Sequence, residues 1–526
     1  MQIRYSFKKS IVSLFCALSI ILCTFGLAAC SDDPFSDYKR TDNTSAMLSR
    51  ATVQYDNING NTVTVDLYKR APNEVLNNPN VGQALLLQGC MRYKQKYPDA
   101  DVSITISSFH FSVVAAACVD VNSRYYGYMR SLYDRDSDSD GFVRISYQLV
   151  QAAKMGINVT VIGQIDASPV KAASGEQKKD LSFDKYFTGH LSDKTDDGKT
   201  VGDYMKYRKS NWTSYGDKSA SDMMHIKMCT VSAYIDDAGN EHGHSVWLGS
   251  TNLDGIDYRG SNGINTGINN GVQTGIIISD HKQLWQVAYN YITLMSNYCG
   301  QEEISVFRDK MIKLNTEQID LITEGKGEQI PEDERVVYLG TESDKVFELY
   351  FTPIGGPMGV WDVKYNPYSK YLSKLLPAVS GGGSITFVWN NPKYRTNFEY
   401  SKTLTQVLQK AFTENARRTN KLYIHLPGFD TTVFDPLVQG KNIGVKKVNT
   451  NLGLSYHSKD FQLSYIEDFE RQYVTVLNTL NMHQGAMSYQ TNSLLVIKET
   501  AETGNDVYVE FGKLTTDGTI TDDDRI

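Results

Sequence analysis

After residue 30 the sequence has no apolar run long enough to cross a membrane as a helix, which takes about 20 consecutive apolar residues. It is also short of basic charge, with 53 Lys and Arg against 60 Asp and Glu. An acidic chain gains little from the field of a polyanion, although a local basic cleft remains compatible with this balance. The composition therefore argues against an indiscriminate nucleic-acid binder.

Cysteine is scarce too, and part of it belongs to the leader described below. Seven cysteines are present, and those beyond residue 30 are Cys90, Cys118, Cys229 and Cys299. Outside the cytoplasm these four could form disulfides. Cys229 is interpreted as a buried filler, because a cysteine nucleophile needs a dedicated base and none is identifiable beside it.

The N-terminus has the pattern of an exported lipoprotein. Basic residues precede an apolar run over 11–26, which is too short for a usual span but suits a signal peptide over 1–29. Leu27-Ala28-Ala29-Cys30 resembles a bacterial lipoprotein cleavage box, with Cys30 as the lipidated residue; the alternative is an ordinary signal peptide with an incidental cysteine. The acidic Ser31-Asp32-Asp33 resembles an export tag for the outer surface. Cleavage removes Arg4, Lys8 and Lys9 and no acid, leaving 50 basic against 60 acidic residues. The prediction is a lipid anchor in the outer membrane, at the cell surface or its periplasmic face.

The most informative pattern is a repeat. His225-Ile226-Lys227 and His457-Ser458-Lys459 lie 232 residues apart, and each has a serine seven residues past the histidine, at Ser232 and Ser464. Each is followed by a hairpin pattern that closes on an asparagine, in Gly249-Ser250-Thr251-Asn252 and Asn478-Thr479-Leu480-Asn481. A single HxK arises easily by chance, but two copies with the same downstream pattern do not.

The spacing has a direct physical meaning. Side chains at i and i+2 of a strand point to one face, so each HxK places an imidazole beside an ammonium group. The returning strand brings its asparagine next to them. Two such units facing each other would surround an anion with two imidazoles, two cations and two amides, which suits a phosphodiester whose oxygens gain charge during transfer.

At these residues the chain resembles the phospholipase D superfamily, whose signature is HxK, four residues, Asp, and then a GSxN turn. The first copy matches it well, and the second has Asn478 and Thr479 in place of Gly and Ser. Ser232 and Ser464 replace the Asp in both copies. The downstream acid that usually orients the histidine is replaced by an amide, with Gln273-Thr274-Gly275 matched to Gln490-Thr491-Asn492. Both departures also occur in the tyrosyl-DNA phosphodiesterase branch.

The resemblance implies a metal-independent phosphodiesterase that forms a covalent phosphohistidine. His225 is expected to attack phosphorus and His457 to protonate the leaving group, with the reverse assignment open. The residues expected to hold the substrate are Lys227, Lys459, Asn252 and Asn481, supported by Ser250, Thr479, Gln273 and Gln490. The expected substrate is a phospholipid head group or another extracellular phosphodiester. The alternatives are a nuclease or tyrosyl-DNA-phosphodiesterase-like enzyme, and a non-catalytic surface binding protein; no cofactor is required.

Strand patterns alternate with helix patterns through both halves, which predicts an α/β protein. The resemblance implies two similar α/β/α sandwich lobes related by a pseudo-twofold axis, with the active site between them. A polar tether is expected over 30–50, lobe 1 over 51–320 with a polar insertion at 167–221, a linker over 321–335, and lobe 2 over 336–526.

One further motif resembles the start of a calcium loop, with carboxylates at alternate positions from Asp136 through Asp138 to Asp140 and then Gly141. The twelfth position is Tyr147, where such a loop needs a bidentate Glu, so a solvated acidic loop is the preferred interpretation. The remaining histidines lack companions with metal-ligand spacing, so no metal site is predicted.

Overall fold

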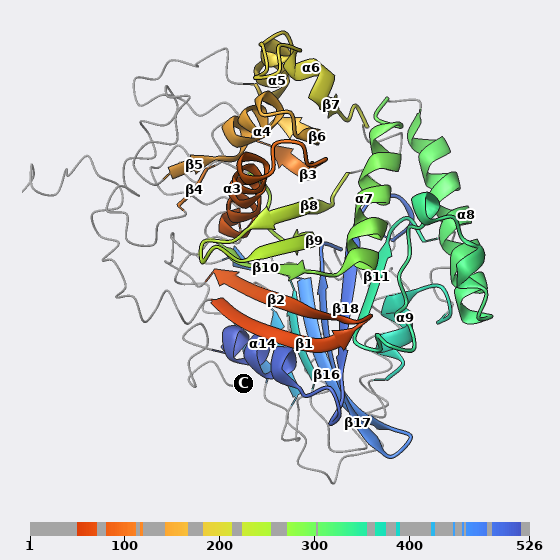
Figure 1. The fold of residues 1–526 in the computed structure, drawn as a ribbon. Coiled ribbons are helices and arrows are strands. Elements are labelled where there is room, and N and C mark those ends of the chain that lie inside the picture. The colour runs from red at the N-terminus through yellow and green to blue at the C-terminus, as the bar shows by residue number, and fades with distance from the viewer. Residues whose placement is uncertain are drawn as a thin grey trace, which may run out of the picture.

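The structure is a computed structural model of residues 1–526. It describes residues 50–70, 80–111, 116–118, 142–166, 182–212, 224–253, 271–300, 303–354, 363–374, 385–389, 422–426, 445–447, 455–456, 459–480 and 487–516. Two large mixed sheets with helices packed on them make up this part of the chain, as the sequence predicts for an α/β protein (Figure 1). We call the parts built around the first and second sheets the first and second lobes.

The first sheet contains nine strands. In spatial order its main path is β1 Arg50–Ile58, β2 Asn61–Arg70, β10 Gly271–Ser279, β9 Glu241–Gly249, β8 Lys227–Ile235, β3 Ser103–Phe111, β6 Asn158–Asp166 and β7 Met205–Lys209. The short β15, Ser455–Tyr456, pairs with the start of β10 in parallel, although it comes from the C-terminal half of the sequence. A separate pair joins β4 Ala116–Cys118 to β5 Phe142–Arg144.

The second sheet repeats the strand order of the first. Its path is β11 Phe347–Phe351, β18 Ser493–Glu499, β17 Glu470–Asn478, β16 Lys459–Glu467, β12 Ile385–Trp389, β13 Leu422–Leu426 and β14 Val445–Lys447. Read from β2 and from β11, both paths begin with four antiparallel pairings and end with two parallel ones. The hairpin β8–β9 therefore corresponds to the hairpin β16–β17.

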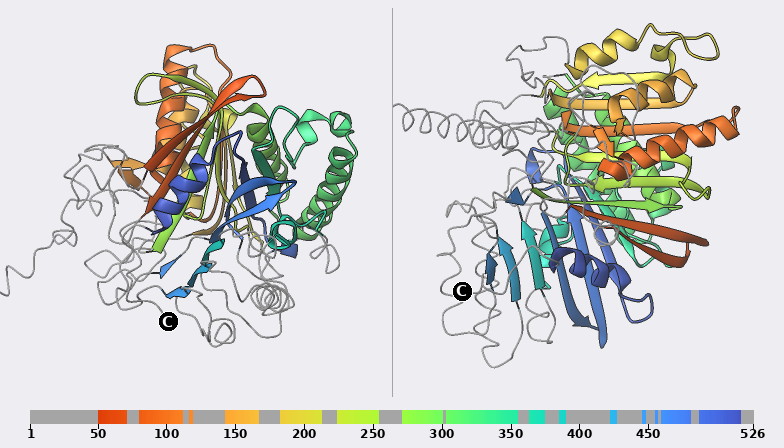
Figure 2. Two further views of the ribbon diagram at one scale, coloured as in Figure 1. Left: turned by 90° about the horizontal axis from the view of Figure 1, so that it is seen from below. Right: turned by 90° about the vertical axis from the view of Figure 1, so that its left-hand side faces the viewer.

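Helices cover the sheets, and the described residues form two hydrophobic cores on opposite faces of the first sheet. Those of the first half are α3 Asn80–Lys96, α4 Ile145–Lys154, α5 Phe183–His190, α6 Val201–Tyr204, α7 Lys282–Ser296 and α8 Ile304–Thr323. The second half has α9 Pro367–Leu372 and α14 Asp506–Thr516. The views in Figure 2 place α3 and α4 on one side of the first sheet and α7 on the other. None of the helices in the described ranges is long and apolar enough to span a membrane.

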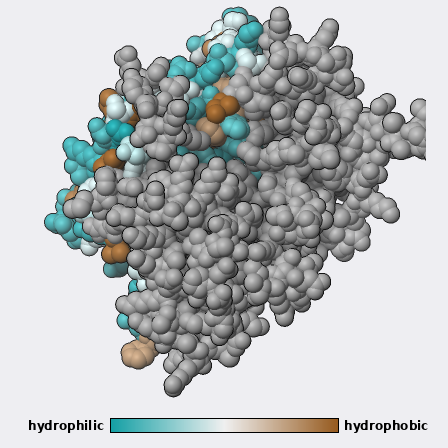
Figure 3. Space-filling model, turned by 180° about the vertical axis from the view of Figure 1, so that it is seen from behind, coloured by the Kyte–Doolittle hydropathy of each residue, from teal (hydrophilic) through white to brown (hydrophobic). Residues whose placement is uncertain are grey.

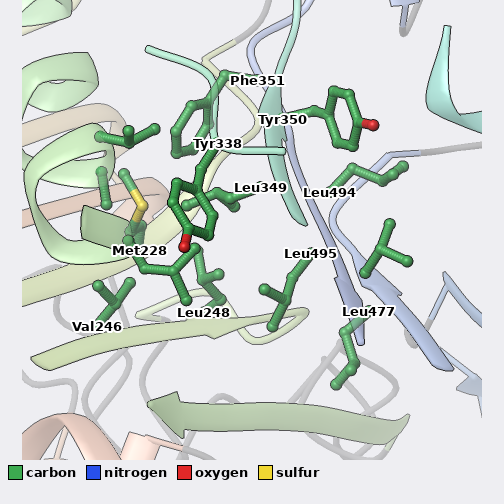
Figure 4. Packing of buried hydrophobic residues seen from close by; sticks show 14 of the residues in the cluster. Met228, Val246, Leu248, Tyr338, Leu349, Tyr350, Phe351, Leu477, Leu494 and Leu495 are labelled. Atoms are coloured by element: carbon green, nitrogen blue, oxygen red, sulfur yellow. The ribbon is translucent and has the colours of Figure 1, made fainter. Parts of the chain in front are cut away.

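Neighbouring residues on the central strands of the first sheet belong to different cores, because alternate side chains point to opposite faces. Cys229 and Trp247 pack in the core under α3 and α4, whereas Met228 and Leu248 pack in the other core. That second core also contains Leu349, Phe351, Leu477 and Leu495 of the second sheet, so it runs continuously from one lobe to the other (Figure 4). The two lobes therefore share one hydrophobic interface.

The range of the predicted linker contains the end of α8 and short helical turns. Helix α8 continues to Thr323, inside the linker range predicted from the sequence, and two short 3-10 turns follow it, η5 Gly327–Gln329 and η6 Glu332–Glu334. Asn290 Nδ2 of α7 donates to the carbonyl oxygens of Glu332 and Arg335, at 2.7 and 3.0 Å. Helix α7 thus anchors the segment that leads into the second sheet.

The predicted polar insertion contains regular secondary structure. Of the predicted range 167–221, the structure describes 182–212, which contains α5, α6 and β7. β7 pairs in parallel with β6 at the edge of the first sheet, and Phe183 and Phe187 are buried in the core under α4. This stretch is part of the first lobe, because its aromatic side chains pack in the core of that lobe although most of its residues are polar.

Cys90, Cys229 and Cys299 are buried free thiols, so none of these three forms a disulfide that the sequence left open. Burial raises the pKa of the Cys229 thiol far above its ordinary value, which fits the interpretation of Cys229 as a filler and not a nucleophile. The predicted signal peptide, Cys30 and the calcium-like Asp136, Asp138 and Asp140 lie outside the described residues. Where Figure 3 is coloured, the surface is mostly hydrophilic, and its apolar patches are small and separate.

Candidate active site

The first half of the predicted site lies at the open end of the hairpin β8–β9. His225 comes two residues before the start of β8, and Asn252 comes three residues after the end of β9. Both side chains are buried, together with Lys227 and Ser250. The antiparallel pairing of β8 with β9 brings the two chain segments together, as the sequence predicts.

His225 is held by the second lobe. Its Nδ1 lies 2.9 Å from Oδ1 of Asn492, the residue directly before β18. The orientation of this amide follows from its other partner. Thr352 Oγ1 donates its single proton to the carbonyl oxygen of Gln490 at 2.6 Å, so it accepts from Asn492 Nδ2 at 3.3 Å. Asn492 Oδ1 is therefore the atom that faces the imidazole.

This arrangement selects one tautomer of the neutral imidazole. Since Asn492 Oδ1 can only accept, Nδ1 of His225 carries the proton and Nε2 carries the lone pair. A lone pair on Nε2 is what a nucleophile or a general base needs. The amide is neutral, so it orients the ring but supports a developing imidazolium less than a carboxylate would.

Lys227 is fully buried beside His225. Its Nζ donates to the backbone carbonyl of His225 at 2.6 Å and lies 5.7 Å from the centroid of the Phe109 ring. Phe109, near the end of β3, also lies 5.6 Å from the His225 ring, so one aromatic side chain contacts both functional groups. A buried ammonium is costly without such partners, and its charge would act strongly on a bound anion.

The end of β3 also holds the closing turn of the hairpin. Asn252 Oδ1 accepts a long hydrogen bond of 3.4 Å from the backbone N–H of His110. Leu253 N donates to Ser108 Oγ at 3.0 Å and Phe111 bridges to Leu253. The turn that carries Asn252 is therefore attached to a neighbouring strand.

The described part of the predicted second half of the site lies at the open end of β16–β17. Lys459 is the first residue of β16 and is buried, and Asn478, the last residue of β17, donates its side-chain amide to the Lys459 carbonyl. Burial lowers the pKa of Lys459 to about 7, although the neighbouring Asp460 carboxylate acts in the opposite direction. The predicted His457 and Asn481 lie outside the described residues.

Ser250 and Thr479 occupy equivalent places in the two turns. Thr274 N donates to Ser250 Oγ at 2.9 Å, and Ser250 Oγ donates to Gln273 Oε1 at 2.8 Å. In the second lobe, Ser493 N donates to Thr479 Oγ1 at 3.0 Å, and Thr479 Oγ1 donates to Asn492 Oδ1 at 3.2 Å. Each hydroxyl thus links its turn to the next strand and fixes an amide side chain.

These hydrogen bonds correct one sequence assignment. The sequence pattern matches Gln273-Thr274 to Gln490-Thr491, yet the residue equivalent to Gln273 is Asn492. The strand register agrees: Gly249 pairs with Gly275, two residues past Gln273, and Asn478 pairs with Leu494, two residues past Asn492. The segment between the closing asparagine and the next strand is shorter in the second copy of the repeat. The two Gln-Thr dipeptides therefore do not occupy equivalent positions. Both Gln490-Thr491 and Asn492-Ser493 show the amide and hydroxyl pattern of Gln273-Thr274, so the strand register is what distinguishes them.

The serines that replace the Asp of the signature lie away from this end. Ser232 is five residues beyond Lys227 on β8, about 17 Å along the strand. Its Oγ accepts from the backbone N–H of Ser103 at 2.9 Å, at the start of β3. Ser464 has the same place on β16 and is buried opposite Tyr473. Ser232 thus supports the sheet away from the His225 imidazole, and Ser464 lies the same number of residues beyond Lys459.

Within the described ranges, no cluster of three or more His, Cys, Asp or Glu side chains is arranged to hold a metal ion.

Comparison with known proteins finds no matching family model and no matching curated sequence. Similar solved structures include phosphatidylserine synthase from Haemophilus influenzae, with 9% identity, a TM-score of 0.46 and 92% of both chains covered. Polyphosphate kinase from Porphyromonas gingivalis is 9% identical with a TM-score of 0.40; the match covers 86% of this chain but only half of the kinase. A mutant of yeast tyrosyl-DNA phosphodiesterase 1 is 10% identical with a TM-score of 0.32, covering 75% of this chain and 82% of that one. Because these values are low, we infer nothing about function from them.

Proposed function

We propose that the protein is a phosphodiesterase of phospholipase D type that works through a covalent phosphohistidine. The observation that carries this proposal is the hydrogen bond from His225 Nδ1 to Asn492 Oδ1, which crosses between the lobes and puts the lone pair of the neutral ring on Nε2. Lys227 lies on the same strand end, and the two HxK strings resemble the superfamily signature. An oriented imidazole beside a buried cation suits attack on an anionic phosphodiester.

The chemistry proceeds in two displacements. His225 Nε2 attacks phosphorus to form a P–N bond while the bond to the leaving oxygen breaks, and His457 gives that oxygen its proton. His457 then takes a proton from water, or from another alcohol, and the resulting oxygen nucleophile attacks phosphorus and breaks the P–N bond. Lys227, Lys459, Asn252 and Asn481 neutralise and orient the non-bridging oxygens, and Ser250 and Thr479 hold the turns that carry the asparagines.

By analogy with Asn492, which orients His225, we propose that Gln273 orients His457. Tyr456 of β15 pairs with Val272 of β10, so the next residues along the two paired segments are His457 and Gln273. Gln273 is fully buried, and its Oε1 accepts from Ser250. In this proposal a pseudo-twofold axis relates the lobes and each supplies an amide to the histidine of the other.

The substrate class follows from the predicted export and charge. A lipid anchor on Cys30 would keep the enzyme at the outer membrane, where a phospholipid head group is the nearest phosphodiester. The acidic composition gives no reason to prefer a polyanion. Replacing Cys30 with Ser should release the protein into the soluble fraction, and retention in the membrane would contradict the anchor.

The activity can be tested with four substrates in the presence of EDTA: phosphatidylcholine, phosphatidylglycerol, single-stranded DNA and bis-p-nitrophenyl phosphate. We expect hydrolysis of a phospholipid and of the synthetic diester. Hydrolysis of DNA but of neither phospholipid would replace the phospholipase proposal with a nuclease. Lack of activity on all four would leave a binding protein as the better explanation.

The covalent step has its own test. A rapidly quenched reaction should contain an acid-labile phosphoramidate on one histidine, located by peptide mass spectrometry at high pH. His225→Ala and His457→Ala should both lack turnover. A phosphoryl group trapped on His457 would reverse the two roles, and full activity of His225→Ala would rule the mechanism out.

A further inference from the structure

The two half-sites differ at the residue that follows each catalytic lysine. In β8 this residue is Met228, which packs in the core between the lobes. In β16 the equivalent residue is Asp460, which is buried to the same degree. A carboxylate in an interface that otherwise takes an apolar side chain is costly unless it is paired and hydrogen-bonded. Its presence therefore needs a compensating interaction.

Asp460 finds that interaction by bridging the lobes. Thr274 Oγ1, from β10 of the first lobe, donates to Asp460 Oδ2 at 2.5 Å. The backbone N–H of Asn478, at the end of β17, donates to the other oxygen at 3.1 Å. Thr274 follows Gln273 directly, and Asn478 precedes Thr479, so the carboxylate joins two chain segments that carry site residues.

We propose that Asp460 is a positioning residue that fixes the first-lobe strand carrying Gln273 against the lysine and closing turn of the second half-site. It acts on the reaction through these residues and does not itself contact substrate. The inference rests on the proposed function and adds to it a dedicated connection between the halves, present on one side of the repeat only.

The charge of Asp460 has a second effect, on its neighbour Lys459. Among the described residues, Asp460 is the charged group that raises the pKa of this lysine, against the larger effect of burial, which lowers it. Asn478 donates to the backbone carbonyl of Lys459 and Thr274 donates to Asp460, so neither of these side chains adds a charge beside the lysine. Removing the carboxylate should therefore make Lys459 lose its proton at lower pH, whereas removing only the threonine hydroxyl should not.

The experiment compares Asp460→Asn and Thr274→Val with a matched pair elsewhere in the interface. Glu499 is also a buried carboxylate that crosses between the lobes, accepting from Tyr55 Oη at 2.6 Å and from Val507 N at 2.9 Å. It lies at the far end of β18, about 23 Å from Asn492 along the strand. Glu499→Gln removes a buried charge, as Asp460→Asn does, and Tyr55→Phe removes a donor hydroxyl, as Thr274→Val does. Both control changes lie away from the site.

For each full-length variant, kcat and KM for bis-p-nitrophenyl phosphate are measured from pH 5.5 to 9, and sulfate binding is measured by calorimetry over the same range. Asp460→Asn should lower kcat about tenfold or more, as loss of a supporting contact does elsewhere, and shift the alkaline limb and sulfate binding to lower pH. Thr274→Val should lower kcat with the limb unchanged. Glu499→Gln and Tyr55→Phe should change thermal stability while leaving both profiles in place.

The outcomes separate this inference from the proposed function. An active wild-type protein whose Asp460→Asn variant keeps its kcat and pH profile, with only the stability loss of Glu499→Gln, would reduce Asp460 to an interface residue. An equal kcat loss in all four variants would show that any damage to the interface disturbs the site. A wild-type protein that neither turns over nor binds sulfate would overturn the proposed function and this inference with it.

Discussion

The hairpin of the first lobe and the hairpin of the second lobe share strand order, register and the hydroxyl that fixes an amide, yet they differ at both ends. At the open end, Met228 and Gln273 of the first lobe correspond to Asp460 and Asn492 of the second. At the closed end, the first hairpin turns through Gly239, with a φ of 90°, whereas the second turns through Asp468 and Phe469, with φ of 50° and 64°. The repeat conserves the scaffold and varies the residues that meet the other lobe or solvent.

The interface between the lobes should be the most sensitive part of this comparison. Phe351 of the second sheet stacks on Tyr291 of α7, with ring centroids 4.1 Å apart, in the core that both lobes share. Phe351→Ala should cost about 3–5 kcal/mol and keep a single unfolding transition. Phe187→Ala, in the core of the first lobe only, is the matched control, and chemical denaturation monitored by fluorescence measures both. Two separate transitions in the wild-type protein would show that the lobes fold independently.

The two orienting amides should matter about equally. Asn492→Leu and Gln273→Leu should each lower kcat by about 10–100-fold with a smaller effect on KM, because each removes the acceptor that we assign to an imidazole N–H. Asn492→Asp should keep turnover and raise the pH at which the histidine loses its proton, since a carboxylate stabilises the imidazolium. Gln490→Leu is the control, and an effect as large as that of Asn492→Leu would restore the sequence-based match.

Anion binding should depend on pH through Lys459. Its pKa is about 7 in the folded protein because of burial, so the side chain is cationic below about pH 7 and neutral above it. Affinity for sulfate, whose charge is constant over this range, should fall up to about tenfold for each pH unit above 7. Lys459→Arg should flatten that dependence, and a flat profile in the wild-type protein would contradict the pKa assignment.

The lowered pKa of Lys459 also affects the stability of the folded protein, which should rise with pH where anion affinity falls. An unfolded lysine keeps its proton to about its ordinary pKa of 10.5, whereas Lys459 in the folded protein loses it near 7. Between these values the unfolded state binds more protons, so this lysine makes the folded protein more stable as the pH rises. Comparing wild type with Lys459→Met by denaturation at pH 7 and pH 9.5 isolates this contribution.

The smallest expected effect is at the closed ends of the hairpins. Phe469 is fully exposed and has a left-handed backbone, which costs a residue with a side chain about 1–2 kcal/mol. Phe469→Gly should therefore stabilise the fold by about 1 kcal/mol. Gly239→Ala is the reverse experiment in the first lobe, where no atom lies within 4 Å of the new methyl group and only backbone strain is added. Stabilisation by Gly239→Ala would contradict this account.

Much of the fold could be read from local pattern. The alternation of strand and helix patterns predicts an α/β protein, and the described residues form two mixed sheets covered by helices. The edge strand β7 escaped prediction because its polar segment has no clear period, and its burial depends on the aromatic side chains of α5. Asn492 was missed because strand register, and not the Gln-Thr dipeptide, decides which amide reaches the next turn.

By itself, the sequence determined the repeat, the α/β class and the end of the first hairpin where an imidazole, an ammonium and an amide group gather, because these depend on spacing along single strands and hairpins. Only the tertiary structure decided that His225 is oriented from the other lobe by Asn492, and that Asp460 bonds to Thr274. These pairs are separated by more than 180 residues, and no local spacing encodes a contact made by packing one sheet on another.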